Sequence, residues 1–131
     1  MKILKMQDEI QTMFSAKDNH SMLHPKALKG KTVGEAKAYI LAMRDFLVEE
    51  IDEIVLAMAN DDKAIKKPWS SRFEALNNAE YQPNDKTQSE SLDMLCFAMN
   101  ILLACGIDAE NVEEQYQAVY DKNVARINNG Y

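Results

Sequence analysis

The stretch SESLDMLCFAMNILLAC, residues Ser89 to Cys105, decides the fold of this chain. From Leu92 onward it is apolar at almost every position, and Asp93 and Asn100 are its strongly polar interruptions. A helix that is hydrophobic all round is a buried helix, and a carboxylate inside one is costly unless its charge is compensated. We therefore expect a buried central helix over about 86–105. Glu90 and Asp93 share one face of it and need a cation, a basic partner or an exposed first turn.

The composition fits one packed, soluble domain spanning residues 1–131. The chain is 47% hydrophobic and contains 8 Met, which is enough to build a core without disulfides or structural metals. A net charge of -6 argues against nucleic acid as a partner, because phosphate binding requires a basic surface. No secretory signal opens the sequence and no apolar run is long enough for a bilayer. We expect a cytoplasmic protein with no membrane partner.

Helical periodicity predicts three further main helices. The first, over 1–16, repeats apolar residues with a helical period, and the last, after Asp108 as its N-cap, turns an apolar side toward the core. The second runs from a capping box at Thr32 and Glu35 to about Asn60. The apolar residues are Ile3, Met6, Ile10, Met13 and Phe14 in the first helix, Ile40, Met43, Leu47, Ile51, Ile54 and Met58 in the second, and Val112, Tyr116, Val119 or Tyr120, and Ile127 in the last. With no convincing strand, the sequence predicts an all-α bundle of four to five helices.

Two of these helices each carry a pair of acids three residues apart. Glu50 and Glu53 border the apolar stripe of the second helix, and Glu90 and Asp93 lie on the central helix. If the two helices are neighbours, the four carboxylates converge and require a counter-charge. Hard divalent cations, Mg²⁺ above all, are bound in this way. The alternative is that Glu50 and Glu53 form a solvated face and that Glu90 belongs to an exposed first turn.

Histidines do not fit the site that the acids suggest. The chain has no Glu-x-x-His motif, which di-iron carboxylate bundles use, so the acids favour Mg²⁺ or Mn²⁺. His20 and His24 lie four residues apart beside Pro25, and we expect solvent-exposed loop residues rather than a metal pair.

The ordered set of motifs resembles a known superfamily. It consists of Glu-Glu-x-x-Glu at 49–53, Glu-x-x-Asp at 90–93, MQDEIQ at 6–11, KKPWSSRF at 66–73, and a terminal signature made of Tyr116, Asn123, Arg126, Gly130 and Tyr131. This set is similar to the all-α nucleoside triphosphate pyrophosphatases, the superfamily of MazG and the dimeric dUTPases. Within it, the chain looks most like the dimeric dUTPases and the bacteriophage dCTP pyrophosphatases, which makes a phage origin conceivable.

The resemblance implies Mg²⁺-dependent cleavage of dUTP or dCTP, between the α- and β-phosphates, to the monophosphate and pyrophosphate. It also implies a homodimer that acts in the cytoplasm, which is the host's cytoplasm if the protein is phage-encoded. The residues that it assigns are Glu50, Glu53, Glu90 and Asp93 as metal ligands, Glu49 and Glu50 as catalytic acids, Gln7, Gln11, Trp69, Phe97 and Asn100 for the base, and Lys122, Asn123, Arg126 and Tyr131 as further substrate contacts.

Two departures from the family pattern leave the preferred base open. Val119 stands where the family usually has a Lys, so Lys122 would replace that phosphate contact. Ile10 and Phe14 stand where dimeric dUTPases commonly place an Asn, which brings dCTP or a modified pyrimidine into contention. Broader MazG-like activity on purine or damaged nucleotides, or a non-catalytic helical interaction module, are the alternatives.

Overall fold

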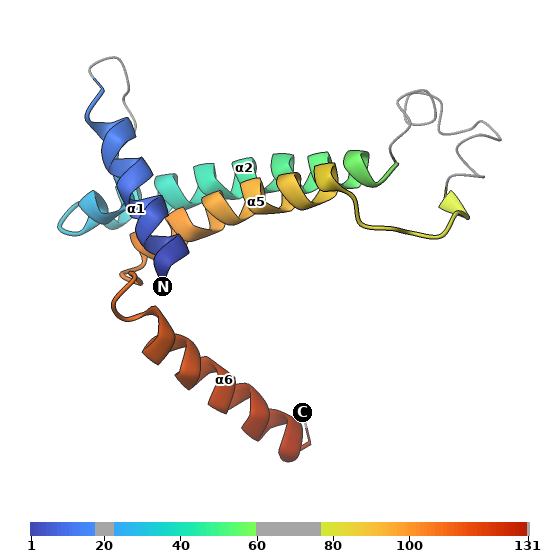
Figure 1. Cartoon of the computed structure of the whole chain (residues 1–131). Helices are drawn as coiled ribbons and strands as arrows, with labels where there is room; N and C mark the ends of the chain where they lie inside the picture. The colour runs from blue at the N-terminus through green and yellow to red at the C-terminus, as the bar shows by residue number, and fades with distance from the viewer. Residues whose placement is uncertain (18–22, 60–76, 131) are drawn as a thin grey trace. The chain divides into compact units, whose positions relative to one another are not determined.

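The computed structural model describes residues 1–17, 23–59 and 77–130. These residues form four α-helices, which are α1 (Lys2–Ser15), α2 (Val33–Ala59), α5 (Asp85–Ala104) and α6 (Val112–Asn128), with a 3₁₀ helix η1 (Pro25–Leu28) (Figure 1). No strand occurs in the described ranges, so the predicted all-α class is confirmed. No helix in them is long and apolar enough to span a membrane.

The chain divides into two compact units. The first contains residues 1–40 and 99–131, and the second contains residues 41–98. The helices α2 and α5 each contribute residues to both units. The prediction of one domain over 1–131 stays a prediction.

In the first unit, α1 is helical as predicted, but the face that it buries differs from the predicted one. Leu4 is fully buried together with the amides Gln7 and Gln11. The apolar residues expected to form the core side, from Ile3 to Met13 at helical spacing, are between 42 and 65% exposed. Gln7 tolerates burial because its Nε2 donates a hydrogen bond to Asn100 Oδ1 at 2.9 Å. The periodicity therefore identified the helix, whereas hydrogen bonding decides which face is covered.

A charged cluster ties α1 to η1. His24 Nε2 lies 2.8 Å from Asp8 Oδ1, and the Lys26 ammonium pairs with the other carboxylate oxygen. His24 Nδ1 accepts the Lys26 backbone N–H, which caps η1. The prediction that His24 is a solvent-exposed loop residue is therefore wrong, because its side chain is only 15% exposed. His20 lies outside the described residues.

The helix ends follow the sequence signals with one exception. Thr32 and Glu35 form the predicted capping box, in which the Glu35 N–H donates to Thr32 Oγ1 at 3.1 Å. Gly106 follows α5 with a φ of 90°, a conformation that favours glycine. Asp108 is not the N-cap of α6, since its Oδ1 accepts the N–H groups of Glu110 and Asn111 in the turn before the helix. The N-cap is Asn111, so the cap prediction was three residues early.

The second unit is built by α2 and α5, which run side by side within it (Figure 1). Its buried residues include Met43 and Ala57, which are 3 and 2% exposed. The predicted stripe on α2 is correct at Met43, Leu47 and Ile54, which are buried or half-buried, and wrong at Ile51 and Met58, which are exposed. The residues of α2 that are buried or half-buried in this unit include Met43, Leu47, Glu50, Ile54 and Ala57. Their spacing of three and four residues forms one stripe, which is the face of α2 on which α5 packs. Glu50 thus lies within the helix interface.

Two expectations about burial in the other helices are wrong. The central helix is not covered all round, since Leu92 is 60% exposed and Asp93 is exposed in the single chain. In α6, whose residues are all described, none is buried, and Tyr116 and Ile127 are the most exposed of its apolar residues. Apolar character predicts that a surface will be covered, but it does not say whether the same chain covers it.

The Asp8 cluster generates a pH prediction. Burial opposes ionisation of Asp8, but the hydrogen bonds and positive charges of Lys26 and His24 outweigh it and lower the pKa of that carboxyl. A lowered pKa stabilises the fold above the pKa of the unfolded chain, and this contribution is lost as the pH falls through the folded value. We expect Asp8→Asn to reduce the free energy of unfolding by about 1 kcal/mol at pH 7, and by much less near pH 3.

Urea denaturation of both proteins at the two pH values measures this difference. Glu9→Gln, at the exposed neighbouring position, is the control and should change stability little at either pH. An equal loss for Asp8→Asn at both pH values would contradict the assignment.

Candidate metal centre

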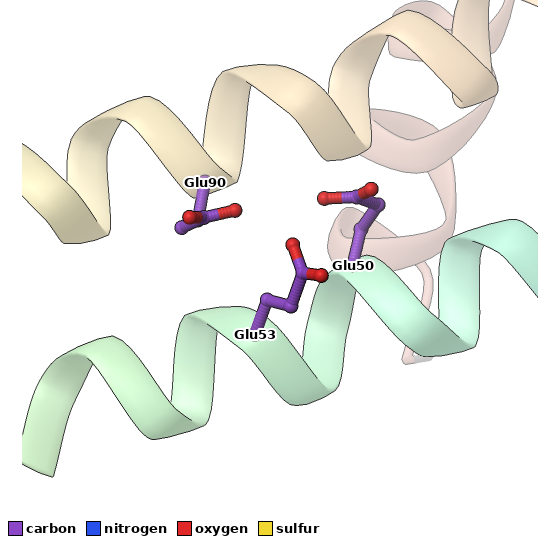
Figure 2. A group of neighbouring side chains, drawn as sticks. All are labelled: Glu50, Glu53 and Glu90. Atoms are coloured by element: carbon purple, nitrogen blue, oxygen red, sulfur yellow. The ribbon is translucent and has the colours of Figure 1, made fainter. Parts of the chain in front are cut away.

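Three carboxylates meet between α2 and α5. Glu50 and Glu53 project from α2 and Glu90 from α5, and one oxygen of each lies within 4.8 Å of the others. Figure 2 shows the three side chains pointing toward one another across the space between the two helices. All three are half-buried and all belong to the second unit. The predicted convergence of acids from two helices is therefore present for these three residues.

The helices place these acids through an antiparallel register. The Phe46 and Phe97 rings stack with centroids 5.1 Å apart and planes inclined by 15°. Glu53 and Glu90 lie seven residues along each helix from the rings, and a carboxylate oxygen of one is within 4.8 Å of an oxygen of the other. Seven residues correspond to two helical turns, so successive turns of the two helices stay level. At this register Glu50 is level with Asp93.

The charges that act on Glu90 within the described residues are mostly negative. The hydrogen bond with Glu53 raises the pKa of Glu90, because one of the two carboxyl groups must keep a proton to make it. Burial and the charges of Glu53 and Asp93 act in the same direction, and Lys86 acts against them. Like charges this close favour a proton or a cation between them.

One oxygen in the cluster has no partner. Glu50 Oε2 is buried and makes no hydrogen bond to any described residue. Leaving a buried polar atom unsatisfied costs about 1–3 kcal/mol. The donor set is made of carboxylate oxygens, which hard divalent cations prefer. Glu50, Glu53 and Glu90 could therefore hold a metal ion, and the unpartnered oxygen is the observation that fits one.

The fourth predicted ligand lies outside this trio. Asp93 is exposed and is not among the three converging acids. Its charge nevertheless acts on Glu90, and together with that of Glu50 it acts on the Cys96 thiol, whose pKa is raised by burial in the first place. Asp93 is thus placed at the rim of the cluster. Glu49, the predicted catalytic acid, is exposed on α2.

The predicted base contacts fall in both units. Phe97, in the second unit, is half-buried against Phe46. Gln7, Gln11 and Asn100, in the first unit, are all buried, and Gln7 is bonded to Asn100. Trp69 lies outside the described residues.

The predicted phosphate contacts lie on α6. Lys122 and Arg126 line a shallow pocket of about 330 Å³ together with Ala125, Asn129 and Gly130. Asn123 is exposed on the same helix and is not part of this pocket's lining. Tyr131 lies outside the described residues.

Phe46 was not predicted to belong to the site. It is 40% exposed although it lies on the α5 side of α2 between Met43 and Glu50. Its spacing, four residues before Glu50 and seven before Glu53, places it on the face of both acids and was visible in the sequence. The sequence did not show which residues of α5 lie beside Phe46, because that depends on the register of the two helices.

The chain resembles one class of enzymes, the nucleoside triphosphate pyrophosphatases, along almost its whole length. The dCTP pyrophosphatase of Enterobacteria phage LZ5 is 29% identical over 140 residues, covering 98% of this chain and 80% of that protein. The dCTP pyrophosphatase of Enterobacteria phage T4 is 25% identical over 119 residues, covering 82% of this chain and 68% of the relative. No family model and no solved structure matches the chain.

The unpartnered oxygen generates a prediction about metal binding. Removing one charge with Glu50→Gln relieves repulsion in the cluster, so we expect this variant to melt at the same or a higher temperature than wild type in EDTA. We expect millimolar Mg²⁺ or Mn²⁺ to stabilise the wild type, by about 2.7 kcal/mol at a free metal concentration of about 100 Kd, and to leave Glu50→Gln nearly unchanged.

Thermal melts with and without metal, supported by calorimetric titration, measure both effects. Asp52→Asn, an exposed acid on the same helix, is the matched control and should keep the metal response. A wild-type protein that binds neither ion would exclude the metal centre.

Proposed function

We propose that this protein hydrolyses a pyrimidine deoxynucleoside triphosphate, dCTP or dUTP, to the monophosphate and pyrophosphate. The convergence of Glu50, Glu53 and Glu90 between two helices carries the proposal, because it provides carboxylate ligands for the cation that a triphosphate requires. Support for the substrate comes from the two phage relatives, which are named dCTP pyrophosphatases. We favour dCTP over dUTP for this reason.

The reaction adds water across the bond between the α- and β-phosphates. Glu50, Glu53 and Glu90 would hold Mg²⁺, or Mn²⁺ in its place, and Asp93 at the rim would complete the ligand set. The bound ion supplies counter-charge and Lewis acidity for the phosphate oxygens. Glu49 would orient the attacking water and accept its proton, which is general-base chemistry that a carboxylate can perform.

The remaining contacts are proposed from the resemblance of the sequence. The Arg126 guanidinium can bind phosphate oxygens as a fork, and Lys122 and Asn123 are its neighbours on α6. Gln7, Gln11 and Asn100 are amides that can present either a donor or an acceptor to a base edge. Phe97, Trp69 and Tyr131 complete the set.

A homodimer is the proposed assembly. On α2 two apolar series each repeat every seven residues. One consists of Leu41, Val48 and Val55, and the other of Ile51 and Met58. All five residues are at least 46% exposed. A seven-residue apolar repeat is the pattern by which helices pair. We expect a second copy to cover this stripe. Hydrolysis of free deoxynucleotides would place the enzyme in the cytoplasm, the host's if the gene is viral.

The activity is tested with a panel of the four common deoxynucleoside triphosphates and dUTP, with Mg²⁺ and detection of pyrophosphate. We expect turnover of dCTP or dUTP and little of the purine nucleotides. Glu90→Gln and Asp93→Asn should each lower kcat by about 100-fold or more, because the metal contributes several kcal/mol to catalysis. Asp52→Asn is the control.

A purified protein that releases no pyrophosphate from any nucleotide would exclude the function. Equal turnover of purine and pyrimidine nucleotides would instead indicate the broader MazG-like activity.

The dimer is tested by light scattering after gel filtration. Val48→Glu puts a charge into the centre of the exposed α2 stripe and should yield monomers, because an unpaired charge at an apolar interface is costly. Glu35→Gln, an exposed acid in the first turn of α2, is the control. A monomeric wild type would contradict the proposal.

A further inference from the structure

The stacked rings of Phe46 and Phe97 lie next to the carboxylate cluster in the second unit. Phe46 precedes Glu50 by four residues on α2, and Phe97 follows Asp93 by four residues on α5, so both rings are one helical turn from an acid. Because α2 and α5 are antiparallel, the ring pair and the acids occupy successive turns of the same helix interface.

Burial along α2 shows that the interface opens at this level. Met43 and Ala57 are buried, with 3 and 2% of their surface exposed, whereas Phe46, which lies between them in the sequence, is 40% exposed. Phe97 is half-buried and covers one face of the Phe46 ring. Part of the Phe46 ring is therefore accessible beside the acids.

The aromatic pair does not stabilise the neighbouring acids electrostatically. The face of an aromatic ring carries negative charge density, so it does not stabilise neighbouring carboxylates. An accessible ring face does, however, stack well with another flat ring, and nucleobases stack on aromatic side chains regardless of their identity.

The spacing matches a nucleotide. A helix rises about 6 Å over the four residues from Phe46 to Glu50, and about 10 Å to Glu53. In a nucleoside triphosphate a single sugar ring separates the base from the first phosphate, so the base lies a short distance to one side of the phosphate chain. With the phosphates at the carboxylate-bound cation, the base reaches the level of the ring pair.

We propose that Phe46 binds the nucleobase of the substrate by stacking, with Phe97 holding the Phe46 ring in place from its other side. This inference rests on the proposed function and adds to it a residue that the sequence did not assign. Because stacking is tolerant of base identity, Phe46 contributes affinity and not selectivity between cytosine and uracil.

The test compares a ligand that has a base with one that has none. Steady-state kinetics with Mg²⁺ give KM for dCTP and for dUTP, and competitive inhibition by inorganic tripolyphosphate reports the metal and phosphate contacts alone. Phe46→Leu keeps the apolar volume but removes the ring, and Phe46→Tyr keeps the ring.

We expect Phe46→Leu to raise KM for dCTP and dUTP by the same factor, about 5- to 30-fold, with the inhibition constant of tripolyphosphate within about twofold of wild type. Phe46→Tyr should stay close to wild type. An equal rise in KM for dCTP and dUTP distinguishes stacking from recognition of the base edge, which would affect the two nucleotides differently.

Three outcomes would overturn the inference. An unchanged KM in Phe46→Leu would show that the ring does not contact the base. An equal rise in KM and in the tripolyphosphate constant would show that Phe46 only positions the carboxylates, and a shift in oligomeric state would show that it contacts another copy. A wild-type protein without turnover would instead fail the proposed function itself, before any variant is compared.

Discussion

The antiparallel register of α2 and α5 is the constraint on which the rest of the second unit depends. The stack of Phe46 on Phe97 fixes it at one level, and the approach of the Glu53 and Glu90 carboxylates to within 4.8 Å repeats it two turns further along. Inserting one residue in either helix between the ring and the acids would rotate the acids around that helix by about 100°. The carboxylate cluster is therefore a product of helix packing, in which aromatic contact sets the position and the acids occupy the next turns.

The acids in this interface oppose the packing that brings them together. Three carboxylates share the space between the helices, one buried oxygen of Glu50 is unpartnered, and the pKa of Glu90 is raised by its hydrogen bond with Glu53. Apolar residues of similar size would pack here at less cost. Acids at such positions fit a binding role better than a structural one.

The sequence predicted the helices well and their faces poorly. The capping box at Thr32 and Glu35 and the stop at Gly106 are local signals, and the structure has both. Convergence of the acids also followed from spacing, since three residues separate Glu50 from Glu53 on one helical face. The failures concern coverage. Periodicity cannot tell that α1 buries Gln7 through a bond to an amide 93 residues away, or that Asp93 lies at a rim. Such facts depend on which element is packed opposite, and that information is not local.

The two apolar stripes of α2 have a consequence for how its sequence can vary. One stripe packs on α5 and includes the acid cluster, and the other, from Leu41 to Met58, is exposed in the single chain. Only a narrow band that contains Asp45, Glu49 and Asp52 lies outside both. An insertion or deletion of one residue within α2 would move both stripes out of phase at once. This helix should therefore tolerate changes in length far less than α6, which buries none of its residues.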